Sequence, residues 1–208
     1  MKIILLAVIG YLIGSIPSGY IFTNKLLNKD LRNFGSGNVG ATNTARVLGI
    51  KLGFLVAVLD GLKGFIAVWI AQLIFASNIS IFAIFLVGLT AIIGHNWSIF
   101  LNFSGGKGVA TTLGVILKIF PMSFLIFVIV WFLITILTRY VSLASLMGAV
   151  SMPFSAFFLR SNSAYFYYMS LLAVIIIFTH HENINRLIKG NESRMSWPPD
   201  KKKGDNNE

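Results

Sequence analysis

Long apolar stretches make up most of the chain, and short polar segments separate them. Six stretches suit a helix that crosses a bilayer, which needs about 20 mostly apolar residues, with a range of roughly 17 to 25. They cover residues 3–23, 53–75, 79–100, 122–138, 141–159 and 164–181. A seventh stretch, residues 108–119, is shorter, and its strictly apolar part would rise only about 18 Å at about 1.5 Å per residue. Pro121 favours a break after it, whereas one helix over residues 108–138 would leave six spans.

The distribution of charge favours the seven-span arrangement. The chain has 17 Lys and Arg residues against 7 Asp and Glu residues, a net charge of +10, and short cytoplasmic loops of membrane proteins carry an excess of Lys and Arg. Seven spans with the N-terminus outside place only Lys2, Lys118 and Arg160 on the outer side. We therefore predict an all-α integral membrane protein with seven transmembrane helices, its N-terminus outside and its C-terminus in the cytoplasm. The first apolar stretch lacks an A-x-A cleavage site, so we expect it to be retained as a span.

The composition excludes several classes of chemistry. The chain contains no cysteine, which excludes disulfides, thiolate metal sites and a thioester intermediate. Its positive charge would suggest nucleic-acid binding in a soluble protein, but anionic lipid head groups and topology explain it here, and we expect no nucleic-acid partner. We expect residues 1–192 to form a single membrane domain and residues 193–208 to form a polar, disordered cytoplasmic tail.

A glycine-rich polar tract, GSGNVGATN, follows the first span at residues 35–43. Its glycines let backbone N–H groups approach an anion closely, and its hydroxyl and amide side chains add further donors. The alternative is a tight interfacial loop with ordinary helix caps. Arg46, just beyond the tract, can bind phosphate in a bidentate manner. The candidate ligands in this region are Ser36, Gly37, Asn38, Thr42, Asn43 and Arg46.

A second tract, SGGKGVATT, occupies residues 104–112. It does not match the phosphate-binding loop G-x-x-x-x-G-K-[ST], because Leu101 stands at the first glycine position and Gly108 follows Lys107. A nucleotide triphosphatase is therefore disfavoured. What remains is a compact turn before a helix N-terminus that could face an oxyanion, or else a basic cytoplasmic loop with capping residues. The candidate ligands are Gly105, Gly106, Lys107 and Thr111.

Several polar residues are placed near the inner ends of the spans. Asp60 and Lys63 share a helix face at i,i+3, and we interpret them as a supporting ion pair, with direct contact to substrate as the alternative. Ser142 either caps the helix that starts near it or lines the site, and capping is the more ordinary role. His180 and Asn183 share a face if their helix continues, so they could orient a nucleophile or accept a proton, or simply make interfacial hydrogen bonds.

The histidines do not suggest a metal site. His95 follows Gly94, and the three histidines of the chain lack metalloprotease spacing, whereas a zinc site needs three or four convergent ligands. We expect no metal and no cofactor. The His-x4-Asp motif of soluble and peripheral acyltransferases is absent, and so is a G-x-S-x-G nucleophile elbow.

Taken together, six segments of the chain resemble one family in order and spacing, from the first span to Glu192. It is the family of bacterial membrane glycerol-3-phosphate acyltransferases that use acyl phosphate, the PlsY type. The segments are GSIPSG at 14–19, GSGNVGATNTAR at 35–46, DGLKG at 60–64, GHNWSIFLNFSGGKGVAT at 94–111, TRYVSLAS at 138–145 and HHENINRLIKGNE at 180–192.

The resemblance implies transfer of a fatty acyl group from acyl phosphate to the 1-hydroxyl of glycerol 3-phosphate, giving lysophosphatidic acid and phosphate. It also implies a bacterial inner-membrane enzyme of phospholipid biosynthesis, with membrane lipid and the soluble enzyme that makes acyl phosphate as partners. It places Ser36, His180 and Asn183 at the reacting centre, and Lys107, Arg46 and the glycine-loop amides on phosphate. We add His95 and Ser142 as candidate substrate ligands. Ser104 stands where family members often have a basic residue, so no phosphate role is assigned to it.

For the mechanism we expect direct attack, because an acyl phosphate is already an activated mixed anhydride. The proton would pass to the phosphate of the donor or to His180, and Ser36 would act as a hydrogen-bonding group. The alternative function is a small membrane transporter of a phosphorylated metabolite, but the chain shows no evident inverted repeat.

Overall fold

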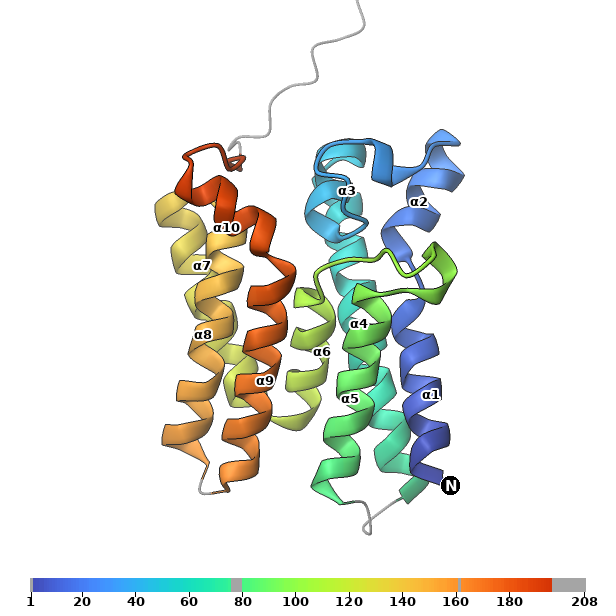
Figure 1. Cartoon of the computed structure of the whole chain (residues 1–208), viewed down its shortest axis with the longest axis vertical. Helices are drawn as coiled ribbons and strands as arrows, with labels where there is room; N and C mark the ends of the chain where they lie inside the picture. The colour runs from blue at the N-terminus through green and yellow to red at the C-terminus, as the bar shows by residue number, and fades with distance from the viewer. Residues whose placement is uncertain (1, 76–79, 161, 196–208) are drawn as a thin grey trace, which may run out of the picture.

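The computed structural model describes residues 2–75, 80–160 and 162–195, and within them the regular elements are helices (Figure 1). The first half contains α1 (Lys2–Ser15), α2 (Ser18–Leu27), the 3-10 turn η1 (Leu31–Asn33), α3 (Ala41–Leu48), α4 (Ile50–Phe75), α5 (Ile81–Asn96) and the 3-10 turn η3 (Ile99–Leu101). The second half contains α6 (Val109–Ile119), α7 (Pro121–Thr138), α8 (Val141–Leu159), α9 (Ser163–Thr179) and α10 (His181–Ile188). Most of the predicted tail, residues 196–208, lies outside the described residues, and so does residue 79 at the start of the predicted third span.

Within the described chain, five segments are long and apolar enough to cross a membrane. They are Lys2–Leu27, Ile50–Ile74, Ile81–Leu101, Pro121–Thr138 and Val141–Leu159. Helices α9 and α10, bent by 62° at His180, make a sixth if they count as one span. These helices confirm an all-helical membrane protein, whereas the count of seven stays a prediction because α6 has only 11 residues.

Helix α6 is separate from α7, as the position of Pro121 predicts. The helices are joined at Phe120, and Pro121 occupies the first turn of α7, where its missing N–H leaves no helical hydrogen bond unmade. In Figure 1, α6 lies between one group of helices, α1 to α5, and another, α7 to α10. It packs closely on α4, since a Cβ at Gly114 would overlap the carbonyl group of Gly61. Small residues at such crossings are typical of membrane helices, whose backbones must approach closely to gain packing energy.

The largest apolar core joins α4, α5, α6, α7, α8 and α9. Its fully buried members include Ile92, Val115, Phe127, Met152 and Leu172. A second cluster joins α1, α4 and α5. By contrast, α7 exposes a row of large apolar side chains on its outer face, as expected for a helix that faces lipid.

The first span differs from the prediction of one helix over residues 3–23. It is interrupted at Ile16 and Pro17, between the end of α1 and the start of α2. Proline has no N–H to donate and clashes with the preceding helical turn, which explains the break. Figure 1 shows that α2, α3, α10 and the segment between α5 and α6 gather toward one end of the bundle. This arrangement brings the two glycine-rich tracts together.

Candidate functional site

A cavity of about 410 Å³ lies where both glycine-rich tracts meet α10. Many of the predicted site residues line it. These are Ser36, Asn38, Thr42, Asn43, Arg46, Asp60, His95, Lys107, Ser142, His180 and Asn183. The structure therefore brings the three predicted catalytic residues to one cavity, together with a cation from each tract.

The first tract is folded around the side chain of Asn43. Asn43 Oδ1 accepts a hydrogen bond from Ser36 N at 2.9 Å, and Asn43 Nδ2 donates to Phe34 O at 2.8 Å. Gly35 has a φ of 60°, and a Cβ there would collide with the Asn43 amide. Asn43 lines the cavity, but its polar atoms are used to hold the loop in shape.

Three predicted ligands, Ser36, Thr42 and Arg46, lie on exposed positions of this tract and of α3. Asn38 Oδ1 accepts from Gly40 N at 2.9 Å just before α3 begins. Arg46 forms no ion pair with any described residue. An anion that binds the Arg46 guanidinium therefore does not have to displace a carboxylate of the described residues.

The second tract forms a turn that leads into α6. Gly108 has a φ of 77°, which glycine adopts without steric cost, and it precedes α6 without a side-chain cap. The first N–H groups of α6 are thus left without a capping side chain at the cavity wall, in an arrangement suited to an anion. Lys107 Nζ donates to Asn183 Oδ1, and Lys107 O accepts from Thr179 Oγ1 at 3.1 Å. These two bonds fix the turn to the end of α9 and to α10.

Four predicted ligands do not line the cavity: Gly37, Gly105, Gly106 and Thr111. Gly105 O accepts from Asn38 Nδ2 at 3.5 Å, which connects the two tracts. Gly106 N donates to His95 O at 2.9 Å. Thr111 is fully buried, and its Oγ1 has no hydrogen-bond partner among the described residues. In this structure the backbone hydrogen bonds of Gly105 and Gly106 hold the turn in shape, and neither residue lines the cavity.

Glu192 is a cavity residue that the sequence analysis did not propose. Its carboxylate accepts from Asn183 Nδ2 at 2.6 Å and from Arg186 Nε at 2.7 Å. Burial alone would raise its pKa, but the hydrogen bonds from Arg186 and Asn183 hold the pKa below its ordinary value. An acidic residue in a basic C-terminal segment was the only local signal of this role. Glu192 thus orients Asn183, which in turn holds Lys107.

The surroundings of Lys107 lower the pKa of its ammonium group. Burial lowers the pKa of its ammonium group, and the positive charge of Arg186 lowers it further, while Glu192 partly opposes both. The side chain is partly exposed and lines the cavity. A phosphate that binds here would therefore be attracted by a positive charge that the nearby carboxylates of the protein balance only in part.

His180 lies at the junction of α9 and α10 and is 4% exposed. Its Nδ1 lies 2.8 Å from Ile176 O. Because a carbonyl oxygen can only accept, this contact assigns the proton to Nδ1 and leaves Nε2 of the neutral ring with a lone pair. The ring is thus prepared to accept a proton at Nε2.

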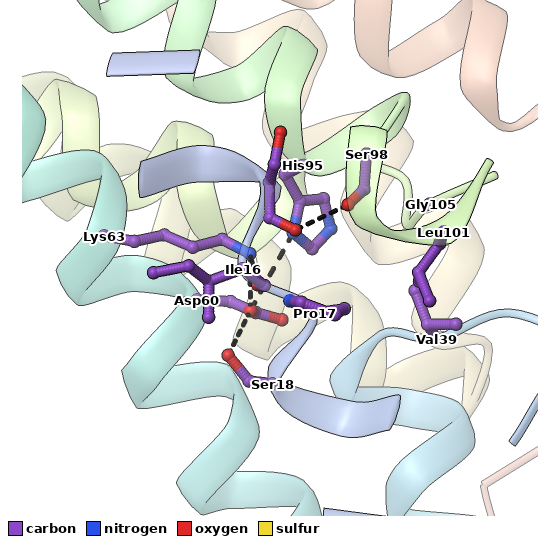
Figure 2. A pocket seen from close by; sticks show the side chains of 11 residues that line it. Ile16, Pro17, Ser18, Val39, Asp60, Lys63, His95, Ser98, Leu101 and Gly105 are labelled. Atoms are coloured by element: carbon purple, nitrogen blue, oxygen red, sulfur yellow. Dashed lines mark hydrogen bonds and ion pairs between the residues drawn. The ribbon is translucent and has the colours of Figure 1, made fainter. Parts of the chain in front are cut away.

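Asp60, Lys63 and His95 form a buried cluster behind the cavity (Figure 2). Asp60 Oδ1 lies 2.9 Å from Lys63 Nζ and 3.8 Å from His95 Nδ1. The predicted ion pair between Asp60 and Lys63 is present. Asp60 and His95 also line the cavity.

Part of the cavity lining is apolar. Its walls include Phe54 from α4, Leu113 from α6 and Phe127 and Trp131 from α7. Trp131 Nε1 donates to Ser145 Oγ at 3.3 Å, which fixes the indole against α8. The cavity lining therefore combines cationic and hydrogen-bonding groups with large apolar side chains.

Ser142 lines the cavity, but the expectation that it caps α8 is wrong. The residue before α8 is Tyr140, and no side chain caps the helix. Ser142 Oγ is buried and lies near the Glu192 carboxylate, where it helps to hold the pKa of Glu192 below its ordinary value.

This arrangement suits transfer of an acyl group between phosphorylated molecules. Two cations and a helix N-terminus can bind phosphate, a neutral histidine can take a proton, and an apolar wall can hold a hydrocarbon chain. Within the described residues, no group of three or more His, Asp or Glu side chains is arranged to bind a metal ion.

Comparison with known proteins agrees with this chemistry. The family model described as glycerol-3-phosphate acyltransferase matches residues 4–190. Glycerol-3-phosphate acyltransferases from Thermoanaerobacter sp. (strain X514) and Fusobacterium nucleatum subsp. nucleatum are each 42% identical, over 94% and 91% of this chain and 96% of each relative. The enzyme from Staphylococcus aureus (strain Newman) is 40% identical over 95% of this chain and all of the relative.

Two crystal structures of PlsY (YgiH), an integral membrane glycerol 3-phosphate acyltransferase, share the fold. The glycerol 3-phosphate form has a TM-score of 0.87 and 41% identity, and the lysophosphatidic acid form has a TM-score of 0.85 and 39% identity. Each comparison covers 94% of this chain and 96% of the other. The chain is therefore a membrane acyltransferase that belongs to the glycerol-3-phosphate acyltransferase family, of the PlsY type.

Proposed function

We propose that this acyltransferase moves a fatty acyl group from acyl phosphate to the 1-hydroxyl of glycerol 3-phosphate, producing lysophosphatidic acid and inorganic phosphate for phospholipid biosynthesis. The observation that carries the proposal is one cavity whose lining includes both the cations Arg46 and Lys107 and large apolar side chains. Donor and acceptor each carry a phosphate, and only the donor carries a long apolar chain. A transporter of a phosphorylated metabolite would need no histidine base and no apolar wall, and family membership opposes it.

In the proposed reaction, the 1-hydroxyl oxygen of glycerol 3-phosphate attacks the carbonyl carbon of the donor. The bond between that carbon and the phosphate oxygen breaks, and phosphate leaves with the electron pair. The hydroxyl proton passes to the leaving phosphate or to His180 Nε2. Arg46, Lys107 and the N–H groups at the start of α6 stabilise the negative charge, and Asn183 positions Lys107.

Ser36 serves as a hydrogen-bonding group in this mechanism and not as a nucleophile. No described base hydrogen-bonds to its hydroxyl, which would be needed to activate it for attack. His95, Ser142, Thr42 and Asn38 would complete the substrate ligands. The glycines of both tracts and Thr111 would shape the phosphate cradles, with Asp60 and Lys63 in support.

The topology that we propose has seven transmembrane helices, with the N-terminus outside and the C-terminus in the cytoplasm. Helix α6 would be the short seventh crossing, shielded from lipid by α4 and α7. The glycine-rich loops, gathered at one end of the bundle (Figure 1), would then face the cytoplasm together with most of the cations. This placement suits the inner membrane of a bacterium, where glycerol 3-phosphate is available from the cytoplasm.

The domain would comprise residues 1–192, with a cytoplasmic tail at residues 193–208. The first residues of that tail are attached to the bundle, since Met195 N donates to Arg139 O at 2.8 Å. The proposed partners are glycerol 3-phosphate, acyl phosphate, membrane lipid and the soluble enzyme that supplies acyl phosphate.

An assay of the purified full chain tests the function. The protein would be incubated with glycerol 3-phosphate and one of three donors: acyl phosphate, acyl-CoA or an acyl carrier protein thioester. We expect phosphate release and lysophosphatidic acid with acyl phosphate alone. No product, or product only with a thioester, would overturn the donor assignment.

A second measurement separates direct from covalent transfer. The protein would be quenched during turnover with acyl phosphate and examined by mass spectrometry, alongside the S36A variant as control. We expect no acyl adduct on Ser36. An acyl group trapped there in the wild type and lost in the variant would refute direct attack.

A further inference from the structure

The buried ion pair of Asp60 and Lys63 has no direct part in the proposed reaction. Asp60 is 2% exposed and Lys63 is 6% exposed, both on α4 at the depth of a span. Charged groups in such a place are costly and usually serve a function or pair with each other. Their contacts show two connections, one to the break in the first span and one to the glycine-rich turn.

The first connection holds the break between α1 and α2. Lys63 Nζ donates to Ile16 O at 2.9 Å, and Ser18 Oγ donates to Asp60 Oδ1 at 3.1 Å (Figure 2). Pro17 lies between Ile16 and Ser18 and cannot donate a backbone hydrogen bond. The ion pair thus binds the polar groups that the break exposes.

The second connection runs through His95. Its Nδ1 lies 3.8 Å from Asp60 Oδ1, so the carboxylate packs against the edge of the imidazole ring without a hydrogen bond to it. Asp60 and His95 both line the main cavity and a second cavity of about 10 Å³ behind it. The carboxylate and the imidazole therefore form part of the wall between the two cavities.

His95 supports the turn that carries Lys107. Gly106 N donates to His95 O at 2.9 Å, and a Cβ at Gly106 would collide with His95 Nε2. The imidazole ring therefore lies against the backbone of the residue that precedes Lys107. Any rotation of the ring must move this turn or separate from it.

We propose that Asp60, with Lys63 as its counter-ion, is a positioning residue for phosphate binding, because it holds the His95 ring in the pose on which the Gly105–Lys107 turn rests. The inference depends on the proposed function, which assigns this turn to a substrate phosphate. An ion pair that only stabilised the bundle would change the melting temperature and the fraction of active enzyme. It would leave the KM of the correctly folded enzyme unchanged.

The test uses the double variant D60N/K63M, which removes both charges and leaves no unpaired charge in the membrane. A matched control is S155A, because Ser155 Oγ makes a buried hydrogen bond to Ser123 Oγ at 2.8 Å between α8 and α7, at residues that do not line the cavity. We expect D60N/K63M to raise the KM of at least one phosphorylated substrate by about 10-fold or more. We expect S155A to leave both KM values within about two-fold.

The H95Q variant, alone and combined with D60N/K63M, tests whether the ion pair acts through the ring. If it does, the effects of the two changes on KM are not additive, and the combined variant is at most about two-fold worse than the more affected parent. Additive effects, or unchanged KM values with only a lower melting temperature, would overturn the proposal. If D60N/K63M does not fold, D60E keeps the charge but displaces the carboxylate, and the same KM readout decides.

The proposed function can fail separately from this inference. Wild-type protein that releases no phosphate from acyl phosphate and glycerol 3-phosphate would refute the reaction. The rise in melting temperature on adding glycerol 3-phosphate then reports binding without turnover. A rise in the wild type that D60N/K63M loses and S155A keeps supports the positioning role, and a rise that D60N/K63M also keeps refutes it.

Discussion

Substitution of Gly106 by alanine tests how closely the second glycine-rich turn must fit against His95. The added Cβ would lie 2.8 Å from His95 Cε1 and 2.9 Å from Cδ2, with Nε2 closer still. Ordinary contact begins at 3.4 Å, so the turn or the ring must move by more than 0.6 Å, which is the difference between 3.4 and 2.8 Å at Cε1 alone. The neighbours leave little room, because His95 is buried and Gly106 N is bonded to His95 O.

This displacement is large enough to affect catalysis. Overpacking of this kind costs about 1–3 kcal/mol of stability, and a misplacement of about 1 Å at a reacting centre can lower the rate by about 100-fold. Lys107 follows Gly106 directly and moves with it. We therefore expect kcat/KM of G106A to fall by roughly 10- to 100-fold, while the protein remains folded.

The assay measures phosphate release from acyl phosphate and glycerol 3-phosphate by purified protein, with melting temperature as a check on folding. G61A is the matched control, because a Cβ at Gly61 would lie 3.5 Å from Ala110 O, which is an ordinary contact. Alanine also favours the helix over glycine by about 0.5–1 kcal/mol, so G61A should keep both activity and stability. If G106A were as active as G61A, the argument that His95 limits the position of the turn would be refuted.

Three further substitutions probe the charges of the site. R46A should raise the KM of a phosphorylated substrate by about 10- to 100-fold, since a hydrogen bond to a charged group contributes about 1.5–3 kcal/mol. Substrate titrations would check this, and R46K should recover part of the lost affinity. The affinity of the enzyme for a phosphorylated substrate should fall as the pH rises and Lys107 loses its proton. Because burial and Arg186 lower the pKa of Lys107 from 10.5, this fall should begin at a lower pH than for an ordinary lysine. A KM–pH profile that K107R moves to higher pH would confirm the assignment. E192Q should lower the melting temperature and kcat together, because Asn183 and Arg186 share that carboxylate. The pKa of Glu192 is lowered from 4.5, so its contribution to stability is complete above pH 4.5 and is lost as acid protonates it. Melting curves against pH should show this loss in the wild type and not in E192Q.

The local features of the site could be predicted from the sequence. The glycine and donor density around Ser36, the cation at Arg46 and the i,i+3 spacing of Asp60 and Lys63 each depend on neighbouring residues. The structure brings these residues to one cavity or to its wall. Short-range patterns predict such features because backbone geometry determines which nearby residues share a face.

Contacts between distant segments could not be predicted in the same way. The contact of Lys107 with Asn183 joins residues 76 positions apart, one just before α6 and the other on α10. Glu192 was missed although Asn183 and Arg186 are near it in sequence, because the carboxylate meets them only after the chain turns back at Gly190, which has a φ of 72°. Asn43 was correctly placed near the cavity, but nothing local indicated that its amide holds the loop.

The break in the first span had a local signal that apolar periodicity concealed. Pro17 lies inside the predicted stretch of residues 3–23, and proline interrupts a helix and frees carbonyl groups, which other groups must bind at membrane depth. Those groups are Lys63 and Ser98, which donate to Ile16 O and Ser15 O. Both donors lie far along the chain, so the sequence could indicate a weak point but not how it is held.

The presence of cationic and apolar side chains in one cavity has a consequence for how the enzyme would meet its two proposed substrates. A long-chain acyl phosphate partitions into the bilayer, gaining about 0.8 kcal/mol for each buried methylene, whereas glycerol 3-phosphate stays in water. One substrate therefore arrives by lateral diffusion in two dimensions and the other by diffusion in three. The rate should then depend on the mole fraction of donor in the membrane and not on its bulk concentration, so that adding inert lipid at constant total donor slows the enzyme by surface dilution.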